Sequence, residues 1–199
     1  MGTRILGIDP GINHTGWGVV EFDGPAVRLV AGGVIEPDRA LPLARRLKTI
    51  AEGLSEVCRE HAPDRAACEK VFVNMNPQST LVLGQARGAA ITAAAFAGLD
   101  VDEYTPSEIK QALTGSGRAL KEDIQRIVAI LLGLGEVLPS DESDAIACAI
   151  CSAHSHAVRT IQAAAPRPGA YANQRTRGAR TGKSRRAWTQ TLRNKGVIP

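Results

Sequence analysis

Four acidic residues could do chemistry together, because each lies where an acidic side chain is unexpected. Asp9 ends an apolar run, Glu69 interrupts the segment AACEKVF, and Asp141 and Asp144 lie near the start of a helical stretch. Carboxylates that gather at one point repel one another, so such a cluster makes sense chiefly where it binds divalent cations. Hard oxygen ligands and substrate phosphates suit Mg²⁺. The four residues therefore predict a Mg²⁺ site that acts on phosphate groups.

Their placement along the chain decides whether these acids can meet. Asp141 and Asp144 are three residues apart and share one face of a helix. All four carboxylates meet if the strands containing Asp9 and Glu69 are neighbours and this helix packs beside them. Three of the acids also have an ordinary explanation, since Asp9 suits a turn and the other two aspartates suit the positive end of a helix dipole. The prediction rests on the group and not on any one member.

The elements that must position these acids begin with three strands. Short β-rich runs separated by turn residues predict an antiparallel meander over residues 4–9, 17–22 and 27–35. From Leu43 onward, apolar residues recur with a helical period, which indicates a crossover helix. A strand over residues 65–71, a helix over 78–97 and a strand over 101–104 are expected to follow.

Residues 105–163 are predicted to be mostly helical. Residues 105–108, TPSE, form a capping box with proline at the first helical position, so a helix containing Lys110 should begin there. The sequence GSG at 115–117 is expected to end it in a flexible loop, and helices over 119–132 and 140–163 should follow. This order predicts an α/β fold with a mixed sheet, three antiparallel strands and then parallel strands, flanked by helices.

Composition and charge divide the chain into two parts. Its 199 residues are 44% apolar, which suffices for one domain with a core. Residues 166–199 contain nine Arg or Lys and no Asp or Glu, so the net charge of +4 leaves about −5 on residues 1–165. We predict a folded domain over 1–165 and a basic tail over 166–199. Basic side chains bind polyanions by displacing counterions from phosphates, although a merely solvated tail has the same composition.

We expect a cytoplasmic protein with no membrane partner. Charged residues precede any apolar run of signal-peptide length. The longest uncharged apolar stretch, 88–99, has 12 residues, whereas roughly 20 are needed to span a bilayer. The four cysteines should then be reduced. The string Cys148-x-x-Cys151-x-x-His154-x-His156 contains zinc-ligand types, but steps of three drift around a helix. Core cysteines and surface histidines are the favoured interpretation.

Four blocks of the sequence resemble the RuvC-type Holliday junction resolvases in order and spacing. They are ILGIDPGINHTGWGVVE, CEKVF followed by LGQARGAA, YTPSEIKQALTGSGRALK, and SDESDAIACAI, within about residues 3–157. The resemblance implies a ribonuclease-H-like fold and a homodimer. It further implies an endonuclease that resolves four-way DNA (Holliday) junctions by paired symmetric nicks in recombination and repair. A branch-migration complex of the RuvA and RuvB type is a possible partner.

The resemblance also implies roles for individual residues. The family's metal-binding catalytic acids match Asp9, Glu69, Asp141 and Asp144, and its lysines near the scissile phosphate match Lys110 and Lys121. An aromatic that stacks on bases at the junction centre matches Phe72, and Arg118 falls in the same DNA-binding stretch as the lysines. Without the resemblance, the alternative is that the lysines are surface residues that keep the protein soluble, and Phe72 is more often a core residue.

Two-metal chemistry follows from this match. Two ions about 3.5 to 4 Å apart hold an attacking water and a leaving 3′-oxygen in line, so the products should be 5′-phosphate and 3′-hydroxyl ends. We expect Mg²⁺, with Mn²⁺ as a substitute and two ions per active site. Lys110 or Lys121 would neutralise charge that grows on the phosphate.

Three other functions fit parts of the sequence. GIDPGxxxTG resembles the phosphate-binding hairpin of ATPases of the actin and sugar-kinase superfamily, which need two such domains. A junction-binding module without activity is disfavoured because all four acids are present, and an RNA-processing nuclease would differ only in substrate. The helix over 81–96 is a candidate dimer interface, although core packing explains its small and apolar residues equally well.

The basic tail gives a prediction of its own. Deleting residues 166–199 should weaken binding to all forms of DNA, because the tail would bind phosphates whatever the DNA sequence. The log-log dependence of affinity on salt should flatten by about 0.9 for each phosphate that the tail neutralises in the natural protein. Binding titrations over a range of salt concentrations measure the slope, and an unchanged slope would mean that the tail does not bind DNA.

Overall fold

The computed structural model describes residues 2–24, 26–71 and 76–164 of the chain, with side chains up to Ala157. Phe72 and the tail over 166–199, both of which the sequence singled out, lie outside the described residues. The domain boundary at residue 165 therefore stays a prediction.

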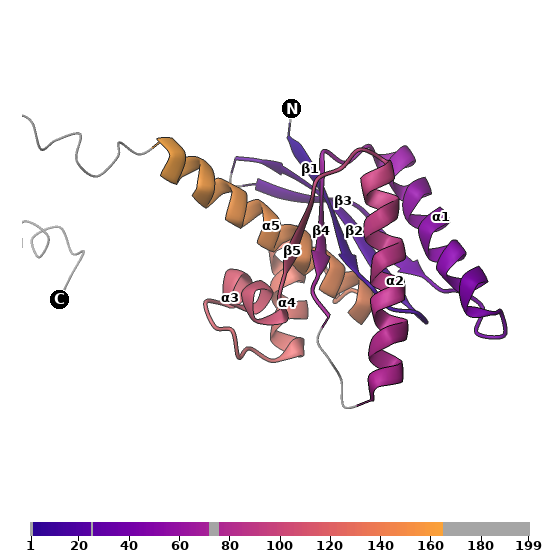
Figure 1. Cartoon of the computed structure of the whole chain (residues 1–199). Helices are drawn as coiled ribbons and strands as arrows, with labels where there is room; N and C mark the ends of the chain where they lie inside the picture. The colour runs from indigo at the N-terminus through magenta and orange to yellow at the C-terminus, as the bar shows by residue number, and fades with distance from the viewer. Residues whose placement is uncertain (1, 25, 72–75, 165–199) are drawn as a thin grey trace, which may run out of the picture. The chain divides into compact units, whose positions relative to one another are not determined.

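Within the described residues, five strands form one mixed sheet in the order β3-β2-β1-β4-β5 (Figure 1). Their bounds are β1 (Thr3–Asp9), β2 (Thr15–Asp23), β3 (Ala26–Ile35), β4 (Arg65–Glu69) and β5 (Val101–Tyr104). β2 pairs with β1 and β3 in antiparallel fashion, whereas β4 pairs with β1 and β5 in parallel. The predicted mixed sheet is therefore confirmed, and β1 lies at its centre.

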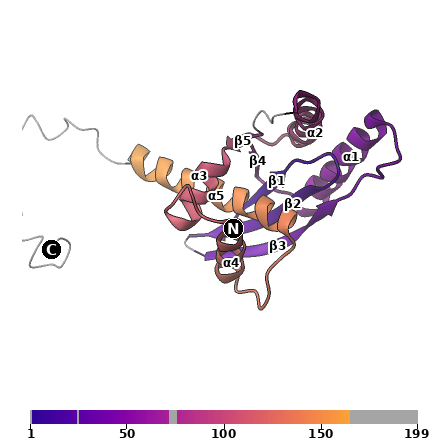
Figure 2. The same cartoon turned by 90° about the horizontal axis from the view of Figure 1, so that it is seen from below.

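Helices cover both faces of this sheet. In the described part of the chain they are α1 (Leu43–His61), α2 (Pro77–Phe96), α3 (Pro106–Thr114), α4 (Lys121–Leu132) and α5 (Ser140–Ala164). Figure 2 shows α1 and α2 on one side of the sheet and α4 and α5 on the other. None of these described helices is long and apolar enough to cross a bilayer.

The central strand has a core on each side because successive residues of a strand point to opposite faces. Ile5 and Leu6 are consecutive, and both are buried. Ile5 packs in the core beneath α3, α4 and α5, together with Ile146. Leu6 packs in the core beneath α1 and α2, together with Ile50. Asp9, at the end of β1, is thus carried by the most enclosed strand of the sheet.

Local signals set several helix and strand ends. At the start of α3, the hydroxyl of Thr105 accepts from the Glu108 N–H at 3.2 Å, and the Glu108 carboxylate accepts from the Thr105 N–H at 2.7 Å. The predicted capping box is therefore confirmed. α4 begins at Lys121 and not at residue 119, because Leu120 is extended and its N–H donates to the side chain of Asp123. β4 ends at Glu69, two residues before the predicted end.

Candidate metal centre and active site

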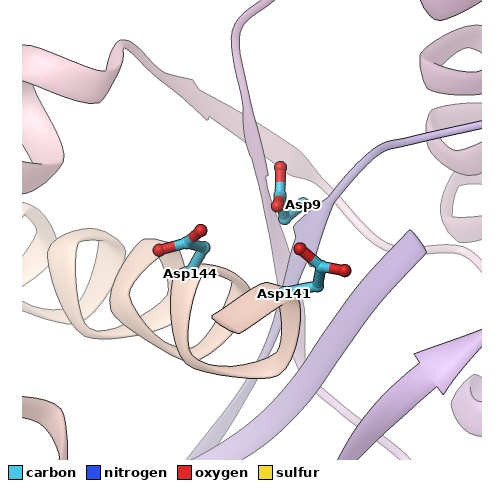
Figure 3. A group of neighbouring side chains, drawn as sticks. All are labelled: Asp9, Asp141 and Asp144. Carbon is cyan, nitrogen blue, oxygen red and sulfur yellow. The ribbon is translucent and has the colours of Figure 1, made fainter. Parts of the chain in front are cut away.

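The parallel pairing of β1 and β4 brings two of the four acids to one edge of the sheet. Asp9 is the last residue of β1 and Glu69 the last residue of β4, and Ile8 is the register partner of Cys68. Parallel neighbours end at the same edge, so Asp9 and Glu69 emerge side by side. The first turns of α5 pass this edge and bring Asp141 and Asp144 to it, as Figure 3 shows.

Three aspartates form a tight group. Asp9, Asp141 and Asp144 each offer one carboxylate oxygen, and these oxygens lie within 4.8 Å of one another. Glu69 is not a member of this group. It lines an adjoining pocket of about 200 Å³ with Asp144, Lys110 and Lys121. The structure thus brings three predicted acids together and places the fourth beside them.

A row of glycines allows α5 to approach the sheet this closely. Gly7, Gly18 and Gly32 are register partners across β1, β2 and β3. A Cβ added to Gly7 would overlap the backbone carbonyl of Ala145, and one added to Gly18 would overlap the side chain of Ile146. The helix therefore rests on the bare backbone of the sheet, which only glycine presents.

Gly16 has the most direct effect on the acids. It is the register partner of Asp9, and an added Cβ would overlap the backbone carbonyl of Asp141. Gly16 therefore allows two candidate metal ligands, Asp9 and Asp141, to lie close together. These glycines were not predicted as site residues, although the alternation TGWG at 15–18 indicates that one face of the strand lacks side chains.

The turn after Asp9 is held by side chains from two other parts of the chain. The Thr15 hydroxyl donates to the Gly11 carbonyl at 2.7 Å. Arg46 of α1 donates to the Ile12 carbonyl at 2.9 Å and to the Asn13 side-chain oxygen at 2.7 Å. Sequence reasoning gave Arg46 no role, because its partners are more than thirty residues away. These bonds restrain the backbone next to Asp9.

Burial and mutual repulsion raise the pKa values of two of the acids. Burial, followed by the charges of Asp144 and Asp141, raises the pKa of Asp9 from 3.8 to about 7. Burial, followed by the charges of Asp9 and Asp144, raises the pKa of Glu69 from 4.5 to about 7. Lys121 opposes both shifts. The cluster holds more negative charge than its surroundings neutralise, which is the electrostatic signature of a cation site.

Lys121 is the cation in direct contact with this cluster. Its Nζ lies 2.6 Å from a carboxylate oxygen of Asp144. Burial alone would lower the pKa of Lys121, but the hydrogen bond to Asp144 and the charges of Asp144, Asp9 and Asp141 outweigh it and raise the pKa. Lys110 lines the same pocket from α3. Arg118 is exposed in the loop between α3 and α4 and does not line this pocket.

Two side chains of α5 lie deeper than the helical period alone indicates. Glu142 is partly buried over Gly32, and burial raises its pKa. His156, expected on the surface with His154, is partly buried and lies 2.6 Å from Asp102 of β5. All four cysteines of the chain are buried free thiols, as the core interpretation predicted. The burial of α5 against the sheet explains each difference, because helical period alone does not show how deep a face lies.

Known proteins match most of the chain. A family model described as crossover junction endodeoxyribonuclease RuvC matches residues 5–152. The RuvC of Bordetella avium is 54% identical over 152 residues, which cover 76% of this chain and 84% of that protein. The RuvC of Burkholderia vietnamiensis is 54% identical over 164 residues, which cover 82% and 91%.

Solved structures match the fold as well. Thermus thermophilus RuvC superposes with a TM-score of 0.74 at 36% identity, covering 79% of this chain and 98% of that one. Its complex with Holliday junction substrate gives a TM-score of 0.75 at 36% identity, with coverage of 79% and 97%. The yeast mitochondrial Holliday junction resolvase Ydc2 shares the fold alone, with a TM-score of 0.58 at 12% identity, covering 82% and 85%. The ribonuclease-H-like fold is therefore confirmed.

The raised pKa values predict how stability depends on pH and on divalent ions. A carboxyl group whose pKa is higher in the folded protein than in the unfolded chain stabilises the fold at low pH. For Asp9 and Glu69 that stabilisation is lost as the pH rises from about 4 to about 7. Mg²⁺ binds the ionised form, so the rise in melting temperature that it causes should grow between pH 5 and pH 8.

Asp9→Asn tests the same electrostatics. Without divalent ions at pH 8, this variant should be more stable than the natural protein by on the order of 1–2 kcal/mol, or a few degrees in melting temperature. Thermal unfolding in EDTA and in Mg²⁺ measures both effects. The repulsion between the acids would be contradicted if the variant were less stable than the natural protein in EDTA. It would also be contradicted if the rise in melting temperature caused by Mg²⁺ did not depend on pH.

Gly16→Ala should displace the first turn of α5 and weaken Mg²⁺ binding at least about tenfold, or 1.4 kcal/mol. Gly18→Ala should have a related effect that Ile146→Ala relieves, because a side chain and not the backbone is in the way. Gly135→Ala is the control, since an added Cβ there meets no atom within 4 Å. Calorimetric Mg²⁺ titration reports the affinities, and equal affinities in Gly16→Ala and the control would refute the role of Gly16.

Proposed function

Since the chain belongs to the RuvC family of crossover junction endodeoxyribonucleases, we propose that it resolves four-way DNA junctions with two Mg²⁺ ions held by its four acidic residues. Members of this family are metal-dependent nucleases. The observation that carries the proposal is the group of three aspartate oxygens within 4.8 Å, next to a pocket lined by Glu69 and two lysines. An ATPase of the actin and sugar-kinase superfamily is set aside by the family assignment.

The donor set suits the ions. Asp9, Asp141, Asp144 and Glu69 offer only carboxylate oxygens, which Mg²⁺ and Mn²⁺ prefer over softer ligands. When bound, the ions would supply an activated water and stabilise the departing 3′-oxygen. Burial raises the pKa values of Asp9 and Glu69, the charges of Asp144 and Asp141 raise that of Asp9 further, and the charges of Asp9 and Asp144 raise that of Glu69 further. We therefore assign Asp9 and Asp144 to the centre of the site.

The two lysines would act on the phosphate. Lys110 and Lys121 lie on different helices and line one pocket with Glu69 and Asp144. A phosphodiester that enters this pocket would meet the ammonium groups as well as the acids. The lysines neutralise charge that accumulates on the non-bridging oxygens as the attack proceeds. Arg118 would contact the DNA backbone outside this pocket, and Phe72 would stack on unpaired bases.

The exposed side of α2 fits an interface between two copies of the chain. The helix buries only small side chains in its own core, namely Ala86, Ala90, Ala93 and Ala94. Its other side exposes Leu81 (64%) and Phe96 (87%). An added Cβ at Gly84 or Gly88 would meet no atom within 4 Å, so a second backbone could approach there. A two-fold dimer would present two sites to two strands of one junction. A complex with branch-migration proteins of the RuvA and RuvB type would be a further partnership.

The interface predicts the outcome of charged substitutions on α2. Leu81→Glu combined with Phe96→Glu should give monomers, because it places four carboxylates in an apolar contact. Light scattering after gel filtration measures the mass. Thr92→Glu, at an exposed position of the same helix, should weaken the dimer less, because it replaces a polar side chain. Paired nicks should give way to single nicks, and an unchanged dimer mass would remove α2 from the interface.

The decisive test of the function is cleavage of a synthetic four-way junction. With Mg²⁺ or Mn²⁺ and without ATP, the protein should nick two opposed strands and leave 5′-phosphate and 3′-hydroxyl ends. Ca²⁺ should support binding and little cleavage, because its looser coordination misplaces the attacking water. Asp9→Asn, Glu69→Gln, Asp141→Asn and Asp144→Asn should each lower the rate by at least about 10³-fold and still bind the junction, because they remove metal ligands and no phosphate contact.

Each rival function has its own result in the same experiment. Binding without cleavage would indicate an inactive junction-binding module, and preferential cleavage of RNA would indicate an RNA-processing nuclease. An acidic residue whose variant cleaves at the natural rate would not belong to the proposed site. Intact junctions in both Mg²⁺ and Mn²⁺, with folded and bound protein, would refute the proposal.

A further inference from the structure

The loop over residues 115–120 separates the two lysines, since it joins α3, which carries Lys110, to α4, which begins at Lys121. The sequence predicted a flexible loop here, because GSG is rich in glycine. The structure has a loop in which every backbone N–H is already bonded. The donors and acceptors are Gly115 to Gln111 O (3.0 Å), Ser116 to Thr114 Oγ1 (3.0 Å), Gly117 to Gln111 Oε1 (3.1 Å), Arg118 to Ser116 Oγ (3.4 Å), Ala119 to Ser116 O (3.2 Å) and Leu120 to Asp123 Oδ2 (3.3 Å).

This bonding has a consequence for DNA binding. Glycine-rich loops that grip phosphates do so with free backbone N–H groups. Residues 115–120 have none to offer, because each N–H is a donor within the loop or to a flanking helix. The loop is preorganised, and only its side chains are available to a nucleic acid.

The side-chain amide of Gln111 closes the loop. Its Nε2 donates to the Gly115 carbonyl at 2.8 Å, and its Oε1 accepts from the Gly117 N–H at 3.1 Å. A carbonyl only accepts and an N–H only donates, so one orientation of the amide satisfies both. Gln111 is exposed, so packing in the core does not explain its presence. Gly117 itself lies against the Ser107 hydroxyl, where a Cβ would crowd it.

The loop determines where Lys121 lies. Lys121 is the first residue of α4, and its Nζ contacts Asp144 at 2.6 Å. Its helix cannot shift without moving the loop that precedes it. Lys110 is the residue before Gln111 on α3. The Gln111 amide, near the end of α3, therefore holds the first residues of the loop that leads to α4, and lysines of both helices line the pocket beside the acids.

We propose that Gln111 is a positioning residue for junction cleavage, which holds the loop so that Lys121 and Arg118 meet the DNA at fixed places. The proposal rests on the proposed function and names the part of the chain that keeps its phosphate-binding side chains in register. Gln111 does not touch the reacting atoms. It acts through the loop, and removal of its two hydrogen bonds should affect the rate more than the affinity or the fold.

Gln111→Leu removes both hydrogen bonds and keeps a side chain of similar volume. We expect faster amide hydrogen exchange confined to residues 112–121, and a single-turnover cleavage rate about tenfold lower at saturating junction and Mg²⁺. Gln111→Glu keeps the acceptor and removes the donor, so its cleavage rate should lie between those of Gln111→Leu and the natural protein. The rise in melting temperature caused by Mg²⁺ should be unchanged, because the acids are intact. Gln125→Leu on α4 is the matched control and should behave as the natural protein.

A double substitution separates positioning from a general loss of folded protein. In a background with both Arg118→Ala and Lys121→Ala, with enzyme in excess and long incubations, Gln111→Leu should slow cleavage less than twofold, because the side chains that it positions are gone. A tenfold decrease in both backgrounds would overturn the proposal. So would natural-like exchange in Gln111→Leu, or a natural rate despite faster exchange. Failure of the natural protein to nick the junction would instead refute the function, while the exchange data would still report on the loop.

Discussion

The contact between the backbone of α5 and the backbone of the sheet is the constraint on which the site depends. At Gly7, and at Gly16 beside Asp9, the helix backbone lies directly on the strand backbone, and at Gly18 and Gly32 the strands leave room for the α5 side chains of Ile146 and Glu142. Ordinary side chains at these positions would push the helix outward. Asp141 and Asp144 would then lie too far from Asp9 to share a cation. The acids define the chemistry, but the glycines define the distances.

The same closeness produces electrostatic strain. Buried carboxylates that repel one another have raised pKa values, and Lys121 offsets this repulsion only in part. The fold tolerates the strain because β1, which carries Asp9, is packed on both faces by apolar cores. Stability supplied by those cores holds together a group that would otherwise separate. Divalent ions relieve the repulsion, so binding of the ions and stability of the fold are coupled.

The remaining parts of the site come from elements that lie far apart in sequence but end at the same edge of the sheet. Parallel pairing brings the ends of β1 and β4 together, and α3 and α4 add lysines to the pocket that Glu69 and Asp144 line. Rigidity recurs in each part. Arg46 and Thr15 restrain the turn after Asp9, and Gln111 restrains the loop before Lys121. Polar side chains thus fix the segments that flank each charged group.

The order of the elements could be predicted from the sequence, because turn residues, the capping box at 105–108 and the apolar periods act over a few residues. The sequence also led to the prediction that the four acids and both lysines are site residues, because the blocks that contain them resemble one family. Tertiary packing places Asp9, Asp141 and Asp144 in the tight group with Glu69 beside them, brings Gly16 and Arg46 next to Asp9 and the turn that follows it, and bonds Gln111 to the loop before Lys121. Distances between carboxylates depend on how closely a helix packs on a sheet, and that closeness arises from contacts between residues as far apart as Gly7 and Ala145, which no local pattern records.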